Sequence, residues 1–144
     1  MATPRSANGS ILYHASGVSP FSWTEVGAIS DLQGPQFSST KIDTTNHNTT
    51  TGYETFIMGL KTSGQVTTKI FFDSTDNSQN ENSNGLLGLF EAQTLETWRI
   101  RLGRTGTQYF TFTAYVQDFK MSFPVNGAMT ADVTFAISDR ATLA

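Results

Sequence analysis

Polar and apolar residues alternate along much of this chain with a period of two, which is typical of β-strands with one buried face. The clearest run covers residues 65–73, where Val66, Thr68, Ile70 and Phe72 fall on one side. The same pattern predicts strands over residues 22–32, 37–44, 97–102, 107–123 and 129–138. Glycine and proline turn signals close several of these runs, at residues 34–35, 103–106 and 124–127. The chain is therefore predicted to be mainly β.

One apolar segment has helical spacing instead. Its apolar residues are Leu86, Leu87, Leu89 and Phe90. Ser83 or Asn84 is a suitable N-cap, and the segment is predicted to end near Gln93. We expect one short helix. The side chains expected to pack against a sheet or at a subunit seam are Leu86, Leu87 and Phe90.

Two polar stretches interrupt the strand pattern. Residues 44–52 consist almost entirely of Thr and Asn, and residues 73–85 are rich in Asp, Asn, Ser and Gln. Neither composition can form an apolar core, so both stretches are predicted to lie outside as loops. For residues 44–52 two interpretations stay open: a surface loop without a partner, or an arm that becomes ordered against a neighbouring subunit.

The length of 144 residues favours a single domain over residues 1–144. Residues 1–10 contain no apolar run, so they are expected to form a flexible N-terminal arm rather than a secretory signal. The apolar clusters at residues 70–72 and 86–90 are far too short to span a bilayer. We therefore expect a protein without membrane contact that stays in the cytosol until it is assembled.

Composition narrows the possible functions further. Only 15% of residues are charged, against about a quarter in typical globular domains. The formal net charge of -3 gives no general attraction to nucleic acid or to an anionic membrane. The sequence has no Cys and two His, which excludes disulfides, a thiolate nucleophile and a metal site rich in Cys or His. No cofactor is expected.

The sequence contains no set of residues that suggests catalysis. It lacks a nucleophile elbow, a P-loop and a dinucleotide-binding fingerprint. Asp43 and His47 are four residues apart, but the polar residues between them predict a loop and remove the helical geometry. His14 stands alone and is interpreted as a surface residue, and Glu91 and Glu96 are a carboxylate pair of very low specificity. We expect a protein that is not an enzyme.

Positive charge is concentrated at Arg99, Arg101 and Arg104. Arg99 and Arg101 share a strand face and could bind phosphate. No aromatic residues interleave with them on the same face, which argues against a nucleic-acid site. Solvation, or ion pairs with carboxylates of a neighbouring subunit, is the favoured interpretation.

Several short strings, in this order and at this spacing, resemble the tail tube (major tail) proteins of long-tailed, non-contractile phages. They are Ile29-Ser30-Asp31-Leu32 before a Gly-Pro turn, Ile42-Asp43-Thr44-Thr45, Tyr53-Glu54-Thr55-Phe56-Ile57-Met58-Gly59-Leu60, Gly64-Gln65-Val66, Asn84-Gly85-Leu86-Leu87 and Phe123-Pro124-Val125. The resemblance spans residues 23–139. Some relatives carry an additional immunoglobulin-like domain, whereas this sequence would be the minimal tube module.

The resemblance implies a β-sandwich or partly closed β-barrel with one flanking helix, assembled into hexameric rings that stack as a tube. The implied partners are further copies of the chain, a tape-measure protein, tail tip and tail terminator proteins, and genomic DNA that passes through the lumen. The implied location is the virion tail, after assembly in the host cytoplasm. The residues expected at contacts between rings are Asp43, Thr45, Asn46, His47, Asn48, Thr49, Thr50 and Tyr53.

The physical character of the chain agrees with this implication. Rings that stack head to tail make a heterologous contact that does not close, so they form a filament. A basic wall would hold DNA through counterion release, whereas a slightly acidic wall rich in Thr, Ser and Asn would not. Two alternatives stay open: a carbohydrate-binding or adhesive β-sandwich with a row of exposed aromatics, and another tail component of the same fold, such as a terminator or hub.

Overall fold

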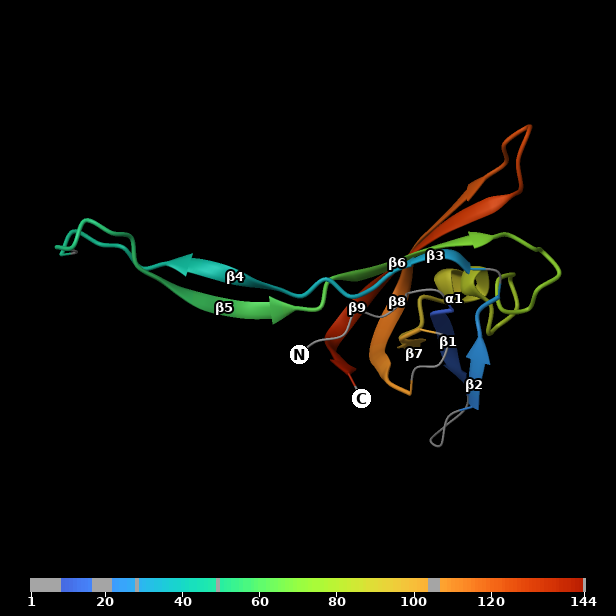
Figure 1. Cartoon of the computed structure of the whole chain (residues 1–144), viewed down its shortest axis with the longest axis horizontal. Coiled ribbons are helices and arrows are strands. Elements are labelled where there is room, and N and C mark those ends of the chain that lie inside the picture. The colour runs from blue at the N-terminus through green and yellow to red at the C-terminus, as the bar shows by residue number, and fades with distance from the viewer. Residues whose placement is uncertain (1–8, 17–21, 28, 49, 104–106, 144) are drawn as a thin grey trace.

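The computed structural model describes residues 9–16, 22–27, 29–48, 50–103 and 107–143. In these residues the chain forms nine strands and one helix (Figure 1). The elements are β1 (Ile11–Ser16), β2 (Ser22–Glu25), β3 (Ile29–Gln33), β4 (Ser38–Asp43), β5 (Phe56–Thr62), β6 (Gln65–Phe71), α1 (Leu86–Ala92), β7 (Glu96–Arg101), β8 (Tyr109–Ser122) and β9 (Thr130–Leu143). Seven strands form one antiparallel sheet in the order β2-β1-β7-β8-β9-β6-β3, and β4 and β5 form a separate two-stranded ribbon.

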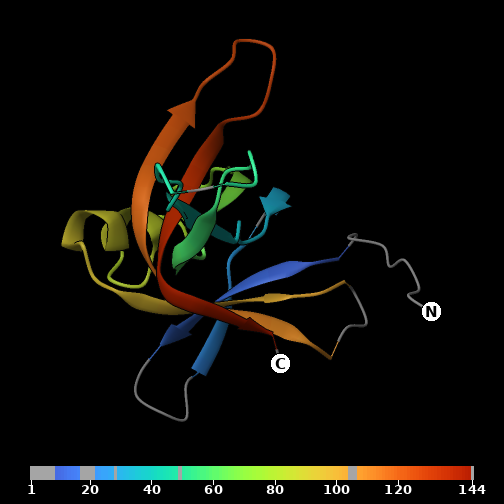
Figure 2. The same ribbon diagram turned by 90° about the vertical axis from the view of Figure 1, so that its left-hand side faces the viewer.

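The large sheet bends around its core without closing. β2 and β3 are its end strands and do not pair with each other. The long strands β8 and β9 extend through both parts of the bent sheet (Figure 2), and their pairing shifts register at two irregularities, which favour bending. The prediction of a mainly β fold with one short helix is confirmed, and the sheets are not closed into a barrel.

The core lies inside the bend and is built by the alternation seen in the sequence. Trp98 is 1% exposed, and its ring centroid lies 4.7 Å from that of Phe135, so β7 and β9 meet across the inner face although β8 separates them in the ladder. The other buried apolar residues of this cluster are Leu12, Val26, Val66, Ile70, Leu86, Leu89, Ile100, Phe112, Ala114, Val116, Ala131, Val133 and Ala141. The hydrophobic effect therefore stabilises one continuous core.

Residues 22–32 do not form the single strand that the sequence predicts. They form β2 and β3, at opposite ends of the sheet. Between them Val26 is buried, and the Gly27 N–H donates to Ser78 Oγ at 3.2 Å. A Cβ on Gly27 would lie 2.6 Å from Asp76 Oδ2, so the chain turns where its backbone packs closely against the polar loop. This tertiary contact overrides the local strand pattern.

The loop of residues 73–85 lies mostly outside, as predicted, but Gln79 is fully buried. Its Nε2 donates to the Gly27 carbonyl at 2.9 Å, and its Oε1 accepts from the Asp73 N–H at 2.8 Å. A buried side-chain amide is stable only when its donors and acceptors are hydrogen-bonded. Of the two partners of Gln79, Gly27 is distant in the sequence and Asp73 lies in the same loop. The expectation that this whole stretch lies outside is therefore wrong at Gln79.

The helix α1 begins at Leu86, but the predicted N-caps are wrong. Gly85 is the N-cap and makes no side-chain capping bond. A Cβ on Gly85 would lie 2.2 Å from the Asn80 carbonyl oxygen, so a larger residue does not fit. The strands β1 and β5 were also not predicted, and β5 is apolar without a period of two.

Candidate assembly surfaces

The ribbon of β4 and β5 projects from the body as a long arm (Figure 1). Here "the arm" means residues 38–62. Its pairing places Ile42 opposite Ile57 on one face and Phe56 and Met58 on the other, and the register shifts between Ser39 and Lys41, beside Leu60. The exposed apolar residues of the two strands are Ile42, Phe56, Ile57, Met58 and Leu60, the last of which is 88% exposed. Two-stranded ribbons are marginally stable alone, and uncovered apolar patches of this kind mark protein interfaces.

The base of the arm is attached to the body by specific contacts. The Gln36 N–H donates to the Ser63 carbonyl at 3.0 Å. Gly64 has φ +72, and a Cβ there would lie 2.5 Å from the Gln36 carbonyl oxygen. The Ile137 N–H donates to the Gly64 carbonyl at 3.1 Å, and the Ala141 N–H donates to Ser63 Oγ at 3.0 Å. Contacts with β9 therefore determine how the arm leaves the body.

The tip of the arm holds the residues expected at contacts between rings. Asp43 Oδ1 accepts from the Thr45 N–H at 2.9 Å, and Asn46 Oδ1 accepts from the Asn48 N–H at 2.8 Å. Hydrogen bonds from Thr45 hold the pKa of Asp43 below its ordinary value, and the bond from the backbone N–H has a larger effect than the bond from the hydroxyl. The exposed tip residues are Asp43, Thr45, Asn46, His47, Asn48, Thr50 and Tyr53, and Thr49 lies outside the described residues. The tip thus presents polar side chains on a hydrogen-bonded loop.

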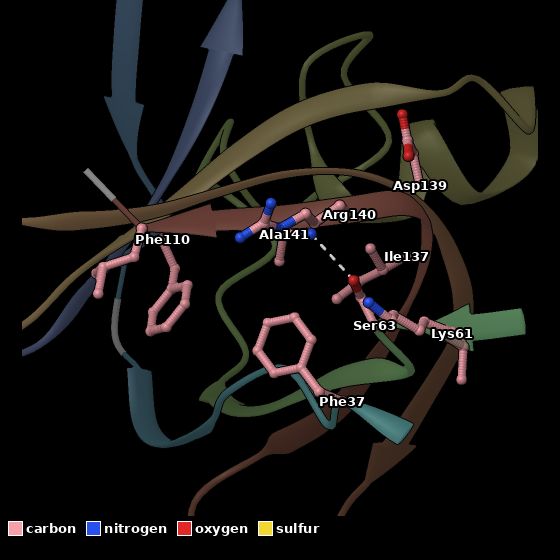
Figure 3. A pocket seen from close by; sticks show the side chains of 10 residues that line it. Phe37, Lys61, Ser63, Phe110, Ile137, Asp139, Arg140 and Ala141 are labelled. Atoms are coloured by element: carbon pink, nitrogen blue, oxygen red, sulfur yellow. Dashed lines mark hydrogen bonds between the residues drawn. The ribbon is translucent and has the colours of Figure 1, made fainter. Parts of the chain in front are cut away.

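A cavity of about 720 Å³ lies where the arm meets the body (Figure 3). Phe37 at the arm's base faces Phe110 of β8, with ring centroids 6.4 Å apart. Lys61, Asp139 and Arg140 line its polar side, and Asp139 has φ 70 within β9. The lining residues come from the base of the arm, from β8 and from β9, so the cavity lies between the arm and the body.

Arg99, expected to be solvated or to form an ion pair with another subunit, is surrounded by aromatic rings. Its guanidinium carbon lies 4.1 Å from the ring centroids of Trp23 and Tyr109, and 5.3 Å from that of Tyr13. The expectation that no aromatics accompany this arginine is therefore wrong. These rings come from β2, β8 and β1, which only the sheet brings beside β7. Cation–π attraction holds the guanidinium within its own chain.

Arg101 also has partners in its own chain. Its Nε donates to the Gly103 carbonyl at 3.1 Å, and its Nη2 donates to the Gly9 carbonyl at 3.2 Å. Arg104 lies outside the described residues. Among the residues that the structure describes, neither Arg99 nor Arg101 is within 4.0 Å of a carboxylate. In the described part of the chain, Arg99 and Arg101 are therefore each held by groups of their own chain.

His14 is not the isolated surface residue that the sequence suggests. It is 4% exposed, its ring centroid lies 4.6 Å from that of Trp98, and its Nε2 lies 3.4 Å from Glu96 Oε2. Burial lowers the pKa of His14, and the Glu96 carboxylate offsets part of this shift. His14 is thus a core residue, and the Glu96 carboxylate faces it.

The three helix residues singled out in the sequence differ in their surroundings. Leu86 is fully buried in the core, Phe90 is half-buried and packs against the core's edge, and Leu87 is half-buried beside Phe72 in a shallow cavity. Leu89 is also buried, and the helix packs on β8. The helix therefore contributes to the core mainly through Leu86 and Leu89.

Other site chemistries find no support in the described residues. In that part of the chain no group of three or more His, Asp or Glu is placed to hold a metal ion. No helix there is long and apolar enough to cross a membrane.

Comparisons with known proteins place these surfaces in context. The family model described as "Lambda phage tail tube protein, TTP" matches residues 7–144. Similar solved structures include the tail of an empty gene transfer agent particle with C6 symmetry (9% identity, TM-score 0.74, covering 98% of this chain and 99% of that one). Another is the sheath–tube complex of an extracellular contractile injection system (14% identity, TM-score 0.69, covering 98% of this chain and 91% of that one). A third is the SPP1 tail tube (11% identity, TM-score 0.68, covering 93% of this chain and 76% of that one). Curated protein sequences include no match.

Proposed function

This chain belongs to the lambda phage tail tube protein family and is a structural tail tube protein, and we propose that its arm joins copies of the chain into the tube. The observation that carries this proposal is the arm itself, a ribbon with uncovered apolar side chains on both faces. A protein that remained a monomer would leave these side chains in water.

Burial of the arm between subunits supplies the energy of assembly. Fully burying a side chain such as Leu60 or Ile57 stabilises a complex by about 1.5–3 kcal/mol. Because both faces are apolar, one neighbouring surface covers only half of the arm. We infer that the arm lies between two neighbours, with the polar tip residues contacting an adjacent ring. These tip residues are Asp43, Thr45, Asn46, His47, Asn48, Thr49, Thr50 and Tyr53.

We infer rings of six copies that stack head to tail in the virion tail after assembly in the host cytoplasm. The C6 symmetry of the gene transfer agent tail, whose subunit has a similar fold, supports this number. A heterologous stack has no intrinsic end, so separate proteins must set its length and close it. The partners we propose are therefore a tape-measure protein and tail tip and tail terminator proteins.

We also propose that DNA passes through the lumen without adhering to it. The net charge of -3 supports this, and so does the enclosure of Arg99 by aromatic rings. Duplex binding by assembled protein, measured by fluorescence at low and moderate salt, is expected to be negligible. Salt-sensitive binding at micromolar concentration would contradict the proposal, because such binding requires several phosphate contacts.

Assembly of purified protein tests the role of the arm. Wild-type protein is expected to form rings or tubes visible by negative-stain microscopy as its concentration rises. The double variant Ile57→Thr/Leu60→Thr is expected to fold with unchanged stability, since both side chains are exposed in the single chain, but not to assemble. Deletion of residues 46–51 is expected to leave a folded subunit that forms no tubes.

Ser38→Thr, a conservative change in the same arm, serves as the control and should assemble normally. Normal tubes from the Ile57→Thr/Leu60→Thr variant would show that the arm is not an assembly surface. A wild-type chain that stays monomeric at all concentrations and salts would overturn the proposed function itself.

A further inference from the structure

The dipeptide Asn-Gly occurs three times in the chain, at residues 8–9, 84–85 and 126–127. Such pairs are chemically labile, because asparagine is thermolabile and glycine has no side chain that shields its backbone nitrogen or restricts its motion. Asn8 lies outside the described residues. The structure places the other two pairs in different surroundings, and these surroundings decide how reactive each pair is.

Asn126 and Gly127 lie at the tip of the hairpin that connects β8 to β9 and projects from the body (Figure 1). Residues 121–129 are all exposed. The atoms nearest to a Cβ added at Gly127 belong to Pro124 of the same turn, at 3.1 Å. Among the described residues, neither the Asn126 side chain nor the Gly127 N–H has a hydrogen-bond partner. The backbone of this pair therefore changes conformation without disturbing the rest of the fold.

The other described pair, Asn84 and Gly85, is held at the start of α1. Asn84 is exposed, but Gly85 is buried, and its N–H donates to the Asn82 carbonyl at 2.8 Å. The Gly85 carbonyl accepts from the Leu89 N–H at 2.9 Å, and a Cβ on Gly85 would clash with the Asn80 carbonyl oxygen. A reaction at the Gly85 nitrogen therefore requires the loss of a buried hydrogen bond and local unfolding.

We propose that Asn126 is a site of spontaneous deamidation in the folded protein, whereas the fold protects Asn84. The Gly127 nitrogen loses its proton to hydroxide and attacks the side-chain carbonyl carbon of Asn126. A C–N bond forms and the bond from this carbon to Nδ2 breaks. The departing nitrogen takes a proton from water and leaves as ammonia, which restores the hydroxide. Water then opens the resulting succinimide at either of its two carbonyl groups and gives aspartate or isoaspartate.

This modification changes the tip of the hairpin and leaves the core intact. Either product carries a carboxylate that is ionised at neutral pH, so each modified copy gains a negative charge at the tip. The new charge lies close in sequence to Phe123 and Val125, whose side chains are 62% and 98% exposed. Isoaspartate also lengthens the backbone of the turn by a carbon atom. The reaction depends only on the fold of the single chain, so it goes beyond the proposed role in assembly and does not require it.

Peptide mass spectrometry of aged protein tests the proposal. Purified wild-type protein is incubated at physiological temperature, at neutral and at mildly alkaline pH, and circular dichroism shows that it stays folded. The peptide with Asn126 is expected to gain the mass of an amide-to-acid exchange at least about tenfold faster than the peptide with Asn84, because only Asn84 reacts through the opening of a buried hydrogen bond. The rate at Asn126 should rise with pH, because hydroxide removes the Gly127 proton.

Two controls separate the effect of the fold from that of the dipeptide. In urea the chain is unfolded, so the difference in rate between Asn126 and Asn84 is expected to largely disappear. Gly127→Ala keeps Asn126 but restricts the backbone, and it should slow the modification severalfold in the folded protein. Equal rates at the two sites of the folded protein, or no mass gain at Asn126, would overturn the proposal. A difference that persists in urea, or an unchanged rate in Gly127→Ala, would overturn it as well.

Discussion

The Ala141 N–H donates a hydrogen bond to Ser63 Oγ at 3.0 Å, and this bond connects the end of the arm to β9. Ser63 is 4% exposed and Ala141 is 2% exposed, so water does not replace either partner. The two residues are separated by 78 positions in the sequence. The direction of the arm therefore depends on a buried polar contact that the arm's own sequence does not contain.

Ser63→Ala is expected to destabilise the subunit by about 1–3 kcal/mol, because it leaves the buried Ala141 N–H without an acceptor. The free energy of unfolding in urea measures this change. Ser39→Ala, at an exposed position of the same arm, should change it by less than about 0.5 kcal/mol. Equal stability of both variants would show that the bond does not hold the arm's base.

Substitution of two glycines, one near the tip of the arm and one at its base, distinguishes the cost of backbone strain from the cost of steric conflict. Gly52 and Gly64 have φ +76 and +72, so an alanine is strained at either position by about 1–2 kcal/mol. Only at Gly64 would the new Cβ also lie 2.5 Å from a backbone oxygen, that of Gln36. Gly64→Ala is therefore expected to cost more than Gly52→Ala in thermal unfolding. Equal costs would show that the joint relaxes without strain.

Buried His14 predicts a decline in stability at mildly acidic pH. The unfolded chain takes up a proton near pH 6.5, whereas burial lowers the pKa of His14 in the folded chain. The stabilisation is complete above pH 6.5 and is lost as the pH falls from 6.5 through the lower folded pKa, because the unfolded state binds the proton first. The free energy of unfolding should fall by at most about 1.4 kcal/mol per pH unit for this group.

Urea unfolding between pH 5 and 7.5 measures this dependence. His14→Phe keeps a ring beside Trp98 and is expected to flatten the profile below pH 6.5. His47→Gln, at an exposed tip position, should leave the profile as in the wild type. A His14→Phe variant with an unchanged slope would assign the pH dependence to other groups.

The aromatic surroundings of Arg99 predict a measurable coupling energy. Removal of the guanidinium in Arg99→Met is expected to cost about 1–2 kcal/mol through lost cation–π contacts. In a double-mutant cycle with Trp23→Leu, the two changes should couple by at least about 0.5 kcal/mol. Arg140→Met, at an exposed position, should not couple with Trp23→Leu. Independent effects of Arg99→Met and Trp23→Leu would contradict the cation–π interpretation.

The sequence by itself determined the elements whose pattern is local. The period of two in β6 and β7 identified their buried faces, because adjacent side chains of a strand must point to opposite sides. The spacing of Leu86 and Leu89 identified the helix, and the composition of residues 44–52 excluded them from a core. The resemblance of ordered strings to tail tube proteins rested on the same local information.

The tertiary structure decided everything that depends on which strands become neighbours. It separated β2 from β3, enclosed Arg99 in rings from three other strands, and buried Gln79 against Gly27. Strand order and register depend on packing between residues that are far apart in the sequence. The local period of a strand therefore does not predict its neighbours or its register. The candidate assembly surfaces are therefore properties of the fold, although each of their residues is visible in the sequence.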